Sequence, residues 1–319
     1  MKVIVVGYGI QGRKRKAAAG AACVAVVDPV STEATHKTLQ DLPLGHYDAA
    51  LVCTPDEPKP ELLAYLLRNG KHVLVEKPLL TDDDTVLQDL QTLAEKNRAV
   101  CYTAYNHRFE PHFIRMKELL ASEALGRAYS LRMFYGNGTA RLVRDSLWRD
   151  SGAGVLPDLG SHLLDTLLFW FPRAMEWDYR LRFAYAHENR CFDQVGIEVT
   201  AGPTGPAVQL EMTLLMWRNH FTADIMAEGG SAHIESLCKW GPSTFTHRRR
   251  LLPSGRPPEN SVTLVQDDPT WQAEYAHFVE LCRTTRQGNI ATDRWLNRVL
   301  STLAASANVP LIPRDIHRG

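Results

Sequence analysis

The sequence has little that could form a cysteine-based site. Its six cysteines are widely scattered, no two of them form a C-x-x-C pair, and none has the spacing of a metal-ligand cluster. This pattern excludes a C-x-x-C redox motif and predicts no metal site. Reduced thiols in a cytoplasm fit it best. The cysteines are Cys23, Cys53, Cys101, Cys191, Cys238 and Cys282.

Net charge and long apolar runs are also missing. Lysine and arginine total 36, as do aspartate and glutamate, so no global field favours nucleic acid or an anionic membrane as a partner. The N-terminal MKVIVVGYGIQG reaches glycine at its seventh residue and lacks the long apolar region of a signal peptide. No segment approaches the run of about 18 apolar residues that a membrane helix needs. We therefore predict a cytoplasmic protein without a membrane segment.

The length of 319 residues predicts two domains, because a single core usually stops growing at about 250–300 residues. In residues 1–105, short apolar runs alternate with amphipathic stretches, which is typical of a parallel α/β sheet. We expect strands at 2–6, 23–27, 49–53, 72–75 and 99–103, and helices at 60–68 and 82–95. The predicted first domain is thus a doubly wound Rossmann sheet.

In the second predicted domain, residues 106–319, the alternating segments become longer. The expected strands are 128–135, 176–186, 195–200 and 207–216, and the expected helices are 161–171, 270–283 and 294–307. Residues 253–260 (PSGRPPEN) are typical of an exposed loop. This pattern predicts an α/β domain with a large, open, mostly antiparallel sheet.

A glycine motif follows the first expected strand. Gly7, Gly9 and Gly12 form G-x-G-x-x-G, in which glycines permit a tight turn, close approach of a pyrophosphate and close helix packing. Asp28 ends the next strand, where its carboxylate would accept hydrogen bonds from a ribose 2′-hydroxyl and repel a 2′-phosphate. The motif therefore predicts NAD rather than NADP. The first helix must be short, about three turns, and the basic run 13–16 is most simply its solvated face.

The segment KHVLVEKPL places Glu76, Lys77 and Pro78 at the carboxyl end of an expected buried strand. Open α/β sheets bind their ligands at that edge. Pro78 restricts the backbone of Lys77, so the lysine would have a fixed direction, toward the nicotinamide. Taken alone, the same three residues could simply end a strand.

A second group of polar residues lies in GAGVLPDLGSHLLD. Asp158 and His162 are four residues apart and would share one face if the segment were already helical there. A histidine can exchange a proton near neutral pH, and a nearby carboxylate can orient its ring. From the spacing alone, an N-terminal capping aspartate beside a hydrogen-bonded histidine is an equal alternative.

Four motifs occur in an order that resembles the Gfo/Idh/MocA oxidoreductases over nearly the whole chain. They are the glycine loop at 7–12, E-K-P at 76–78, N-x-R-F at 106–109 and D-x-G-x-H-x-x-D at 158–165. The resemblance implies hydride transfer between NAD and a sugar or cyclitol carbon, and an open sheet that often forms an oligomer interface. Lys77, Asp158 and His162 match the family's catalytic trio. By that resemblance His162 is the general base, Lys77 holds the substrate oxygen, and Asp158 helps to bind and orient the substrate.

The resemblance also implies two sets of ligand-binding residues. The cofactor set is Gly7, Tyr8, Gly9, Ile10, Gln11, Gly12, Asp28, Cys53, Thr54, Pro55, Glu76, Lys77 and Asn106. The substrate set is Lys77, Arg108, Arg144, Trp148, Arg149, Asp158 and His162. The chain is short for this family, so we expect the peripheral loops that shape substrate choice to be trimmed.

The arginines and the tryptophan before the second motif bear on the substrate. Arg141, Arg144, Trp148 and Arg149 suit a nucleotide-linked sugar, because guanidinium groups bind phosphate and an indole packs on a sugar or base. Solvated arginines are the alternative, as they are for residues 248–250. We predict oxidation of a nucleotide-activated hexose, UDP-N-acetylglucosamine at C3, a step of lipopolysaccharide biosynthesis, by a homo-oligomer (dimer or tetramer) joined through its C-terminal sheet. The alternatives are a free-sugar or inositol dehydrogenase, a ketosugar reductase, or an NAD-binding sensor without turnover.

Overall fold

The computed structural model describes residues 1–284 and 287–312, which form two compact units. The first unit is Met1–Asn106 with Thr270–Asn297, and the second is His107–Pro269 with the chain from Arg298. The first unit thus takes up a C-terminal segment that the predicted domain 1–105 does not include. Residues 313–319 of the predicted second domain lie outside the described residues.

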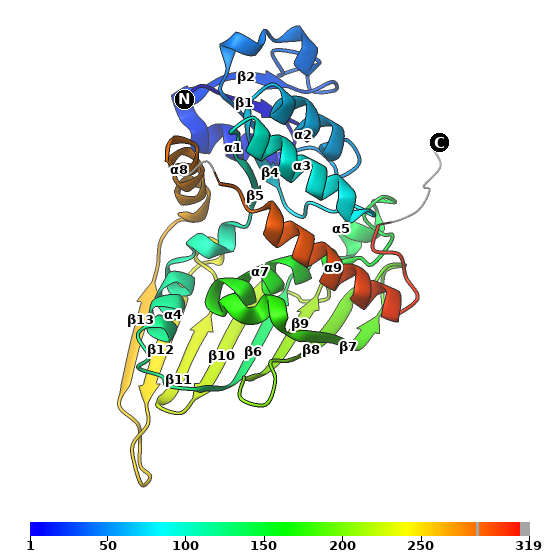
Figure 1. Ribbon diagram of the computed structural model, residues 1–319. Helices are drawn as coiled ribbons and strands as arrows, with labels where there is room; N and C mark the ends of the chain where they lie inside the picture. Colours follow the sequence, from blue (N-terminus) through cyan, green and yellow to red (C-terminus); the bar gives the residue numbers. More distant parts are fainter. Residues whose placement is uncertain (285–286, 313–319) are drawn as a thin grey trace. The chain divides into compact units, whose positions relative to one another are not determined.

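The first unit contains a parallel five-stranded sheet with the order β2-β1-β3-β4-β5 (Figure 1). Its strands are β1 Val3–Val6, β2 Cys23–Val27, β3 Ala49–Val52, β4 His72–Glu76 and β5 Cys101–Ala104. The strands are short apolar runs because both faces of the sheet are covered. All five predicted strands and the predicted Rossmann fold are confirmed.

Alternate residues of the strands enter two hydrophobic cores. Ile4 and Val6 pack in the core on the side of α2 (Lys59–Arg68) and α3 (Asp84–Lys96). Val3 and Val5 pack in the core that contains residues of α1 (Ile10–Ala19) and α8 (Thr270–Arg283). Helix α1 has ten residues, which confirms the prediction of about three turns. The connection between β2 and β3 contains two short 3₁₀ turns, Leu39–Asp41 and Leu44–His46. As the structure describes it, this connection contains no α-helix, which is the usual crossover between parallel strands.

Helix α8 belongs to the first unit because its residues complete that unit's core. Phe278 is fully buried there, and Glu274, also fully buried, forms an ion pair with Arg15 of α1 at 2.7 Å. The following segment is held by β5, since Thr103 Oγ1 donates to Asp293 Oδ2 at 2.7 Å. No local pattern in the sequence near residue 105 predicts these contacts.

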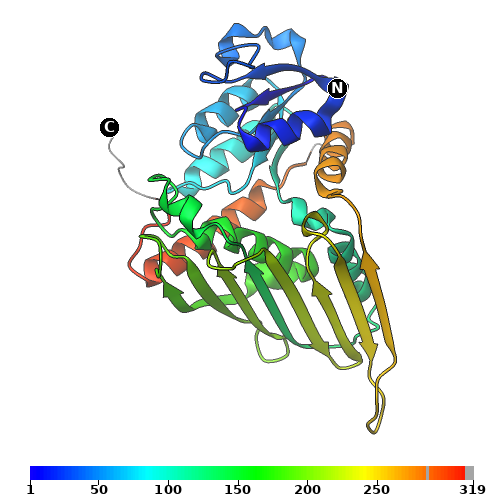
Figure 2. The ribbon, with the colours of Figure 1, turned by 180° about the vertical axis from the view of Figure 1, so that it is seen from behind.

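The second unit is built on an eight-stranded sheet with the order β13-β12-β11-β10-β6-β9-β8-β7. Neighbouring strands are antiparallel except β6 and β9, which confirms the predicted open, mostly antiparallel sheet. Helices α4 (Pro111–Ala121) and α7 (Gly160–Trp170) cover one face (Figures 1 and 2). The strands are β6 Ala128–Gly136, β7 Asp178–Tyr185, β8 Gln194–Thr200, β9 Ala207–Thr213, β10 His220–Ala227, β11 Gly230–Glu235, β12 Ser243–Arg249 and β13 Glu259–Leu264.

The predicted elements of this unit are confirmed up to β9, and four strands after it were not predicted. Residues 253–260 are an exposed loop only as far as Pro258, because β13 begins at Glu259. The remaining helices are α5 Ala140–Arg144, α6 Val155–Asp158 and α9 Ile290–Ser306, of which α9 begins four residues before the predicted 294. None of the helices in residues 1–284 and 287–312 has the length and apolar character that crossing a bilayer requires.

Candidate active site

The glycine loop lies between β1 and α1, at the carboxyl edge of the parallel sheet. Gly7 has φ +88°, and a Cβ there would lie 2.7 Å from the Cys53 carbonyl oxygen. A Cβ at Gly12 would lie 2.0 Å from the Gly7 carbonyl oxygen. Both positions therefore require glycine for the chain's own packing.

Gly9 is different from the other two glycines. It is the N-cap of α1 with φ −76°, a value open to any residue, and a Cβ there would meet no atom of the described residues within 4 Å. The chain's own packing gives no reason for glycine here, whereas a pyrophosphate approaching the helix N-terminus does. The loop therefore fits the phosphates of a dinucleotide.

Asp28 follows β2 and accepts three backbone N–H groups. Its Oδ2 accepts from Tyr8 at 2.6 Å, and its Oδ1 accepts from Val30 at 2.9 Å and Ser31 at 2.7 Å. Partial burial alone would raise the pKa of this carboxyl, but the hydrogen bonds from Ser31, Tyr8 and Val30 outweigh it and lower the pKa. The ionised carboxylate thus lies beside the glycine loop, where it can accept hydrogen bonds from the hydroxyl groups of a ribose.

The predicted cofactor residues Cys53, Thr54 and Pro55 directly follow β3, the strand next to β1, at the carboxyl edge of the sheet. Burial raises the pKa of the Cys53 thiol, so it stays protonated. The buried Thr54 Oγ1 has no hydrogen-bond partner within the part of the chain that the structure describes. A buried hydroxyl of this kind fits a polar ligand group at this edge.

Glu76 and Lys77 follow β4 at the same edge of the sheet. Arg15, only 1% exposed, donates from Nε to Glu76 Oε1 at 2.6 Å. The interpretation of the run 13–16 as a solvated face is therefore wrong for Arg15, because its guanidinium pairs with two carboxylates, the partly buried one of Glu76 and the fully buried one of Glu274. Asn106, the last predicted cofactor residue, donates from Nδ2 to Thr270 Oγ1 at 2.8 Å.

In the second unit, Asp158 and His162 lie on separate helices. Asp158 ends α6 and His162 lies in the first turn of α7, and Leu159 between the two helices keeps right-handed helical dihedrals (φ −92°, ψ −31°), so a shared face of the two side chains stays a prediction. His162 is 6% exposed, and its ring stacks on that of His107 with a centroid distance of 4.0 Å and an interplanar angle of 17°.

The cluster around His162 contains three polar residues that the sequence analysis did not select. They are His107 itself, Tyr135 of β6 and Lys239, whose Nζ lies 3.5 Å from both His107 Nε2 and Tyr135 Oη. An ammonium group only donates hydrogen bonds, so the contact with Lys239 favours the His107 tautomer with its proton on Nδ1. Burial raises the pKa of the Tyr135 hydroxyl and keeps it neutral. His107 is adjacent to the N-x-R-F arginine, but no sequence signal joins it to Lys239.

The predicted substrate residues of this unit fall into two groups. Arg108 forms a two-point ion pair with the buried Asp165, at 2.8 Å (Nε to Oδ2) and 2.7 Å (Nη2 to Oδ1). Arg144, the last residue of α5, is exposed, and in the segment that follows α5 Trp148 is exposed and Arg149 partly exposed. That segment is anchored by buried Asp150, whose Oδ1 accepts the Arg190 and Cys191 N–H groups at 2.7 and 3.1 Å. Arg248, in contrast, pairs with Glu259 at 2.6 Å.

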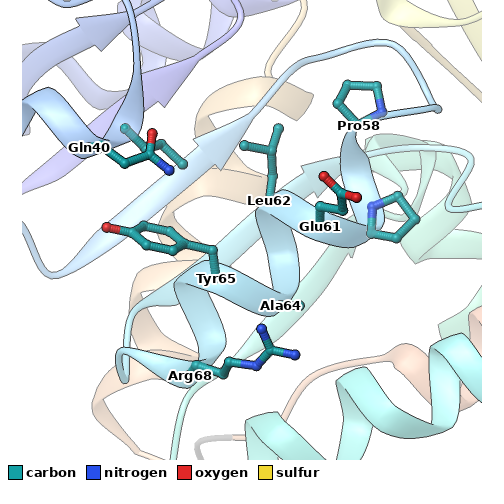
Figure 3. Close-up of a pocket in the computed structure, with 9 residues that line it drawn as sticks. Gln40, Pro58, Glu61, Leu62, Ala64, Tyr65 and Arg68 are labelled. Carbon is teal, nitrogen blue, oxygen red and sulfur yellow. The ribbon is translucent and has the colours of Figure 1, made fainter.

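A hollow of about 600 Å³ in the first unit lies away from these residues, between α2 and the turn at Leu39–Asp41 (Figure 3). Pro58, Glu61, Tyr65 and Arg68 line it, and its lining contains no residue predicted for cofactor or substrate. We therefore give it no part in the candidate site.

Family models match both units of the chain. Residues 1–105 match the oxidoreductase family with an NAD-binding Rossmann fold, and residues 113–233 match the GFO/IDH/MocA C-terminal domain. Together the two matches span more than half of the chain. They identify the cofactor as NAD, as the glycine loop and Asp28 predict.

Curated relatives and solved structures agree with this family. The chain is 29% identical over 154 residues to inositol 2-dehydrogenase 2 of Saccharopolyspora erythraea, covering 43% of this chain and 45% of that protein. It is 27% identical over 239 residues to inositol 2-dehydrogenase of Mycolicibacterium smegmatis, covering 73% and 64%. The matches thus span less than two thirds of either relative.

Two solved structures share the fold over almost the full length. Levoglucosan dehydrogenase in complex with NADH has a TM-score of 0.81 at 15% identity, covering 99% of this chain and 100% of that one. UDP-N-acetylglucosamine 3-dehydrogenase GnnA of Acidithiobacillus ferrooxidans has a TM-score of 0.78 at 20% identity, covering 96% and 97%. At these identities the likeness is one of fold.

Proposed function

This chain belongs to the Gfo/Idh/MocA oxidoreductase family, and we propose that it is an NAD-dependent dehydrogenase that oxidises a ring hydroxyl of a sugar-like alcohol. The observation that carries the proposal is the position of Lys77. It follows β4 at the same carboxyl edge as the glycine loop after β1, with only β3 between the two strands. Adjacent strands lie about 4.8 Å apart, so a lysine two strands away lies within a dinucleotide's length of the loop.

In the proposed reaction, three side chains act on the substrate. A nitrogen of the His162 imidazole accepts the hydroxyl proton as the carbon gives up its hydride. The Lys77 ammonium holds the same oxygen and stabilises the negative charge that develops on it. Asp158 binds and orients the substrate. When bound, NAD supplies the hydride acceptor at C4 of its nicotinamide.

For the substrate, we propose a nucleotide-activated hexose, with UDP-N-acetylglucosamine oxidised at C3. Exposed Arg144, partly exposed Arg149 and Trp148, which is 62% exposed, support this choice. Guanidinium groups bind a diphosphate through paired hydrogen bonds, and an indole packs on a sugar or base. A free cyclitol is the second candidate, favoured by the inositol 2-dehydrogenases that match at 27–29% identity.

NADH formation, followed by absorbance, tests the proposal with a panel of UDP-sugars, free sugars and inositols. We expect turnover of a UDP-sugar by the wild type and a fall in kcat of at least about 100-fold in Lys77→Ala, in the range of a lost charge-stabilising donor. Turnover of inositol alone would favour the second candidate. Tight NADH binding without turnover of any alcohol, in either direction, would indicate a sensor and overturn the proposal.

A further inference from the structure

A second, buried lysine holds the backbone of the loop that carries Lys77. Lys59 is the first residue of α2 and is only 2% exposed. Its Nζ donates to the Glu76 carbonyl oxygen at 2.8 Å and to the Pro78 carbonyl oxygen at 2.9 Å. These two carbonyls belong to the residues directly before and directly after Lys77.

The hydrogen-bonding capacity of Lys59 is used within the chain. Its third donor bonds Asp56 Oδ1 at 2.6 Å, which supplies a counter-charge for the buried ammonium. An ammonium group has three hydrogens, and the three acceptors account for all of them. Lys59 therefore has no donor left for a ligand, and any part it has in the reaction must act through the loop.

Two separate cations fix residue 76. Lys59 binds its carbonyl oxygen, while Arg15 binds its side-chain carboxylate at 2.6 Å. The Lys77 side chain itself is a flexible stem, so its direction depends on the backbone from which it starts. A displacement of about 1 Å in a catalytic group can cost about 100-fold in rate.

We propose that Lys59 is a positioning residue, which fixes the carbonyl groups of the residues before and after Lys77 and so aims the Lys77 amine at the substrate oxygen. The inference rests on the proposed function, because it gives Lys59 an effect on turnover through Lys77. Its distinctive consequence is that Lys59 matters to kcat only while Lys77 is present.

The test compares Lys59→Met with Lys71→Met. Lys71 also donates to a backbone carbonyl, that of Tyr47 at 2.7 Å, but it precedes β4 and so lies at the opposite end of that strand. We expect kcat to fall about 10- to 100-fold in Lys59→Met, with the Kd of NADH changed less than about 3-fold, since the displaced group is Lys77 and not the dinucleotide loop. Lys71→Met should keep kcat within about 2-fold of wild type, as expected for a change outside the site.

A double-mutant cycle separates positioning from general damage. In a Lys77→Ala background, Lys59→Met should lower kcat by no more than about 2-fold, because residues that act as a unit are not additive. If Lys59→Met lowered kcat in the Lys77→Ala background by the same factor as in the wild type, the inference would be overturned. If Lys59→Met does not fold, Lys59→Gln, which keeps an N–H donor without the charge, takes its place in the cycle.

Amide hydrogen exchange gives a readout that needs no substrate. Exchange at residues 76–80 should be faster in Lys59→Met and unchanged in Lys71→Met, because only the first substitution releases the two carbonyls. If the wild type turns over no alcohol, the proposed function fails, and unchanged exchange would show separately that Lys59 does not hold the loop. If the wild type is active and Lys59→Met keeps its kcat, the inference fails while the proposed function stands.

Discussion

Of the three glycines in the loop, Gly9 is the one that the chain's own packing does not require. Gly7 needs a positive φ, and Gly12 lies against the Gly7 carbonyl, whereas the Cβ position of Gly9 is open. The fold of the chain therefore requires glycine at positions 7 and 12, whereas binding of the dinucleotide requires it at position 9. Substitutions at Gly9 and Gly12 can separate binding from stability.

We expect Gly9→Ala to weaken NADH binding without destabilising the fold. The added methyl group would meet the pyrophosphate and raise the Kd of NADH about tenfold or more, equivalent to about 1.4 kcal/mol. The free energy of unfolding should change by less than about 0.5 kcal/mol. Fluorescence titration with NADH and urea denaturation measure the two quantities.

Gly12→Ala is the matched control for this prediction. Its methyl group would lie 2.0 Å from a backbone oxygen, so it should destabilise the fold by about 1–3 kcal/mol or more. If Gly9→Ala destabilised the protein as much as Gly12→Ala, the assignment of Gly9 to the dinucleotide would be wrong.

The residues of the site differ in how far sequence could predict them. The glycines, Asp28, Lys77 and His162 lie in short motifs, where local spacing carries the chemistry. His107 and Lys239 are 132 residues apart, and Arg15 meets carboxylates on β4 and α8. Contacts of this kind depend on the tertiary fold, so a basic run that is typical of a solvated helix face can contain a buried arginine.

At the scale of elements, Arg15 joins α1, the end of β4 and α8. Its guanidinium bonds Glu76 at 2.6 Å, pairs with Glu274 at 2.7 Å and lies 4.4 Å above the ring of Trp271. Because Glu274 is fully buried, removal of the arginine would leave a carboxylate without its counter-charge inside the unit.

We expect Arg15→Met to destabilise the first unit by about 3–5 kcal/mol, the usual cost of breaking a buried ion pair by removing one partner. Arg13→Met, in the same helix, removes the surface pair with Glu33, whose side chains are 50% and 57% exposed, and a contact with the Tyr8 ring, and should destabilise the unit much less. Urea denaturation followed by circular dichroism compares them. Equal losses in the two variants would contradict the structural role given to Arg15.

The two sheets show why some elements were predictable and others were not. Strands of the parallel sheet are apolar runs because they are buried on both faces, so β1 to β5 were all found. The edge strand β13, ENSVTL, contains mostly polar or partly exposed residues and resembles a loop. Helix α6 was not predicted, because the expected helix began at residue 161, and Leu159 between α6 and α7 keeps right-handed helical dihedrals (φ −92°, ψ −31°).

At the scale of the whole molecule, the large sheet has one face without α4 and α7. On β10, Phe221, Ala223 and Ile225 are buried, whereas the alternate residues Asp224 and Met226 are exposed, Met226 by 55%. A single exposed apolar side chain does not by itself mark an interface. The expectation that a second copy of the chain packs on this face therefore stays a prediction, and Met226 is the position at which we test it.

We expect light scattering to give the mass of at least two chains of 35.8 kDa. Met226→Lys should lower that mass toward a single chain, because a charge buried in an interface without a partner is costly. Leu252→Lys, at a 68% exposed loop position, is the control and should leave the mass unchanged. A wild-type mass of 35.8 kDa would overturn the prediction.

The NAD-binding unit is discontinuous along the chain, because it needs Thr270–Asn297 to complete the core that Met1–Asn106 begins. A ribosome therefore synthesises all strands of the eight-stranded sheet before α8 and the residues that bond β5. Until then the nascent first unit exposes the apolar surface that Phe278 later covers and leaves Arg15 without Glu274. The unit that carries the dinucleotide site, although encoded first, can be completed only after α8 has been made, and a gene fragment that ends after residue 106 would yield an incomplete domain.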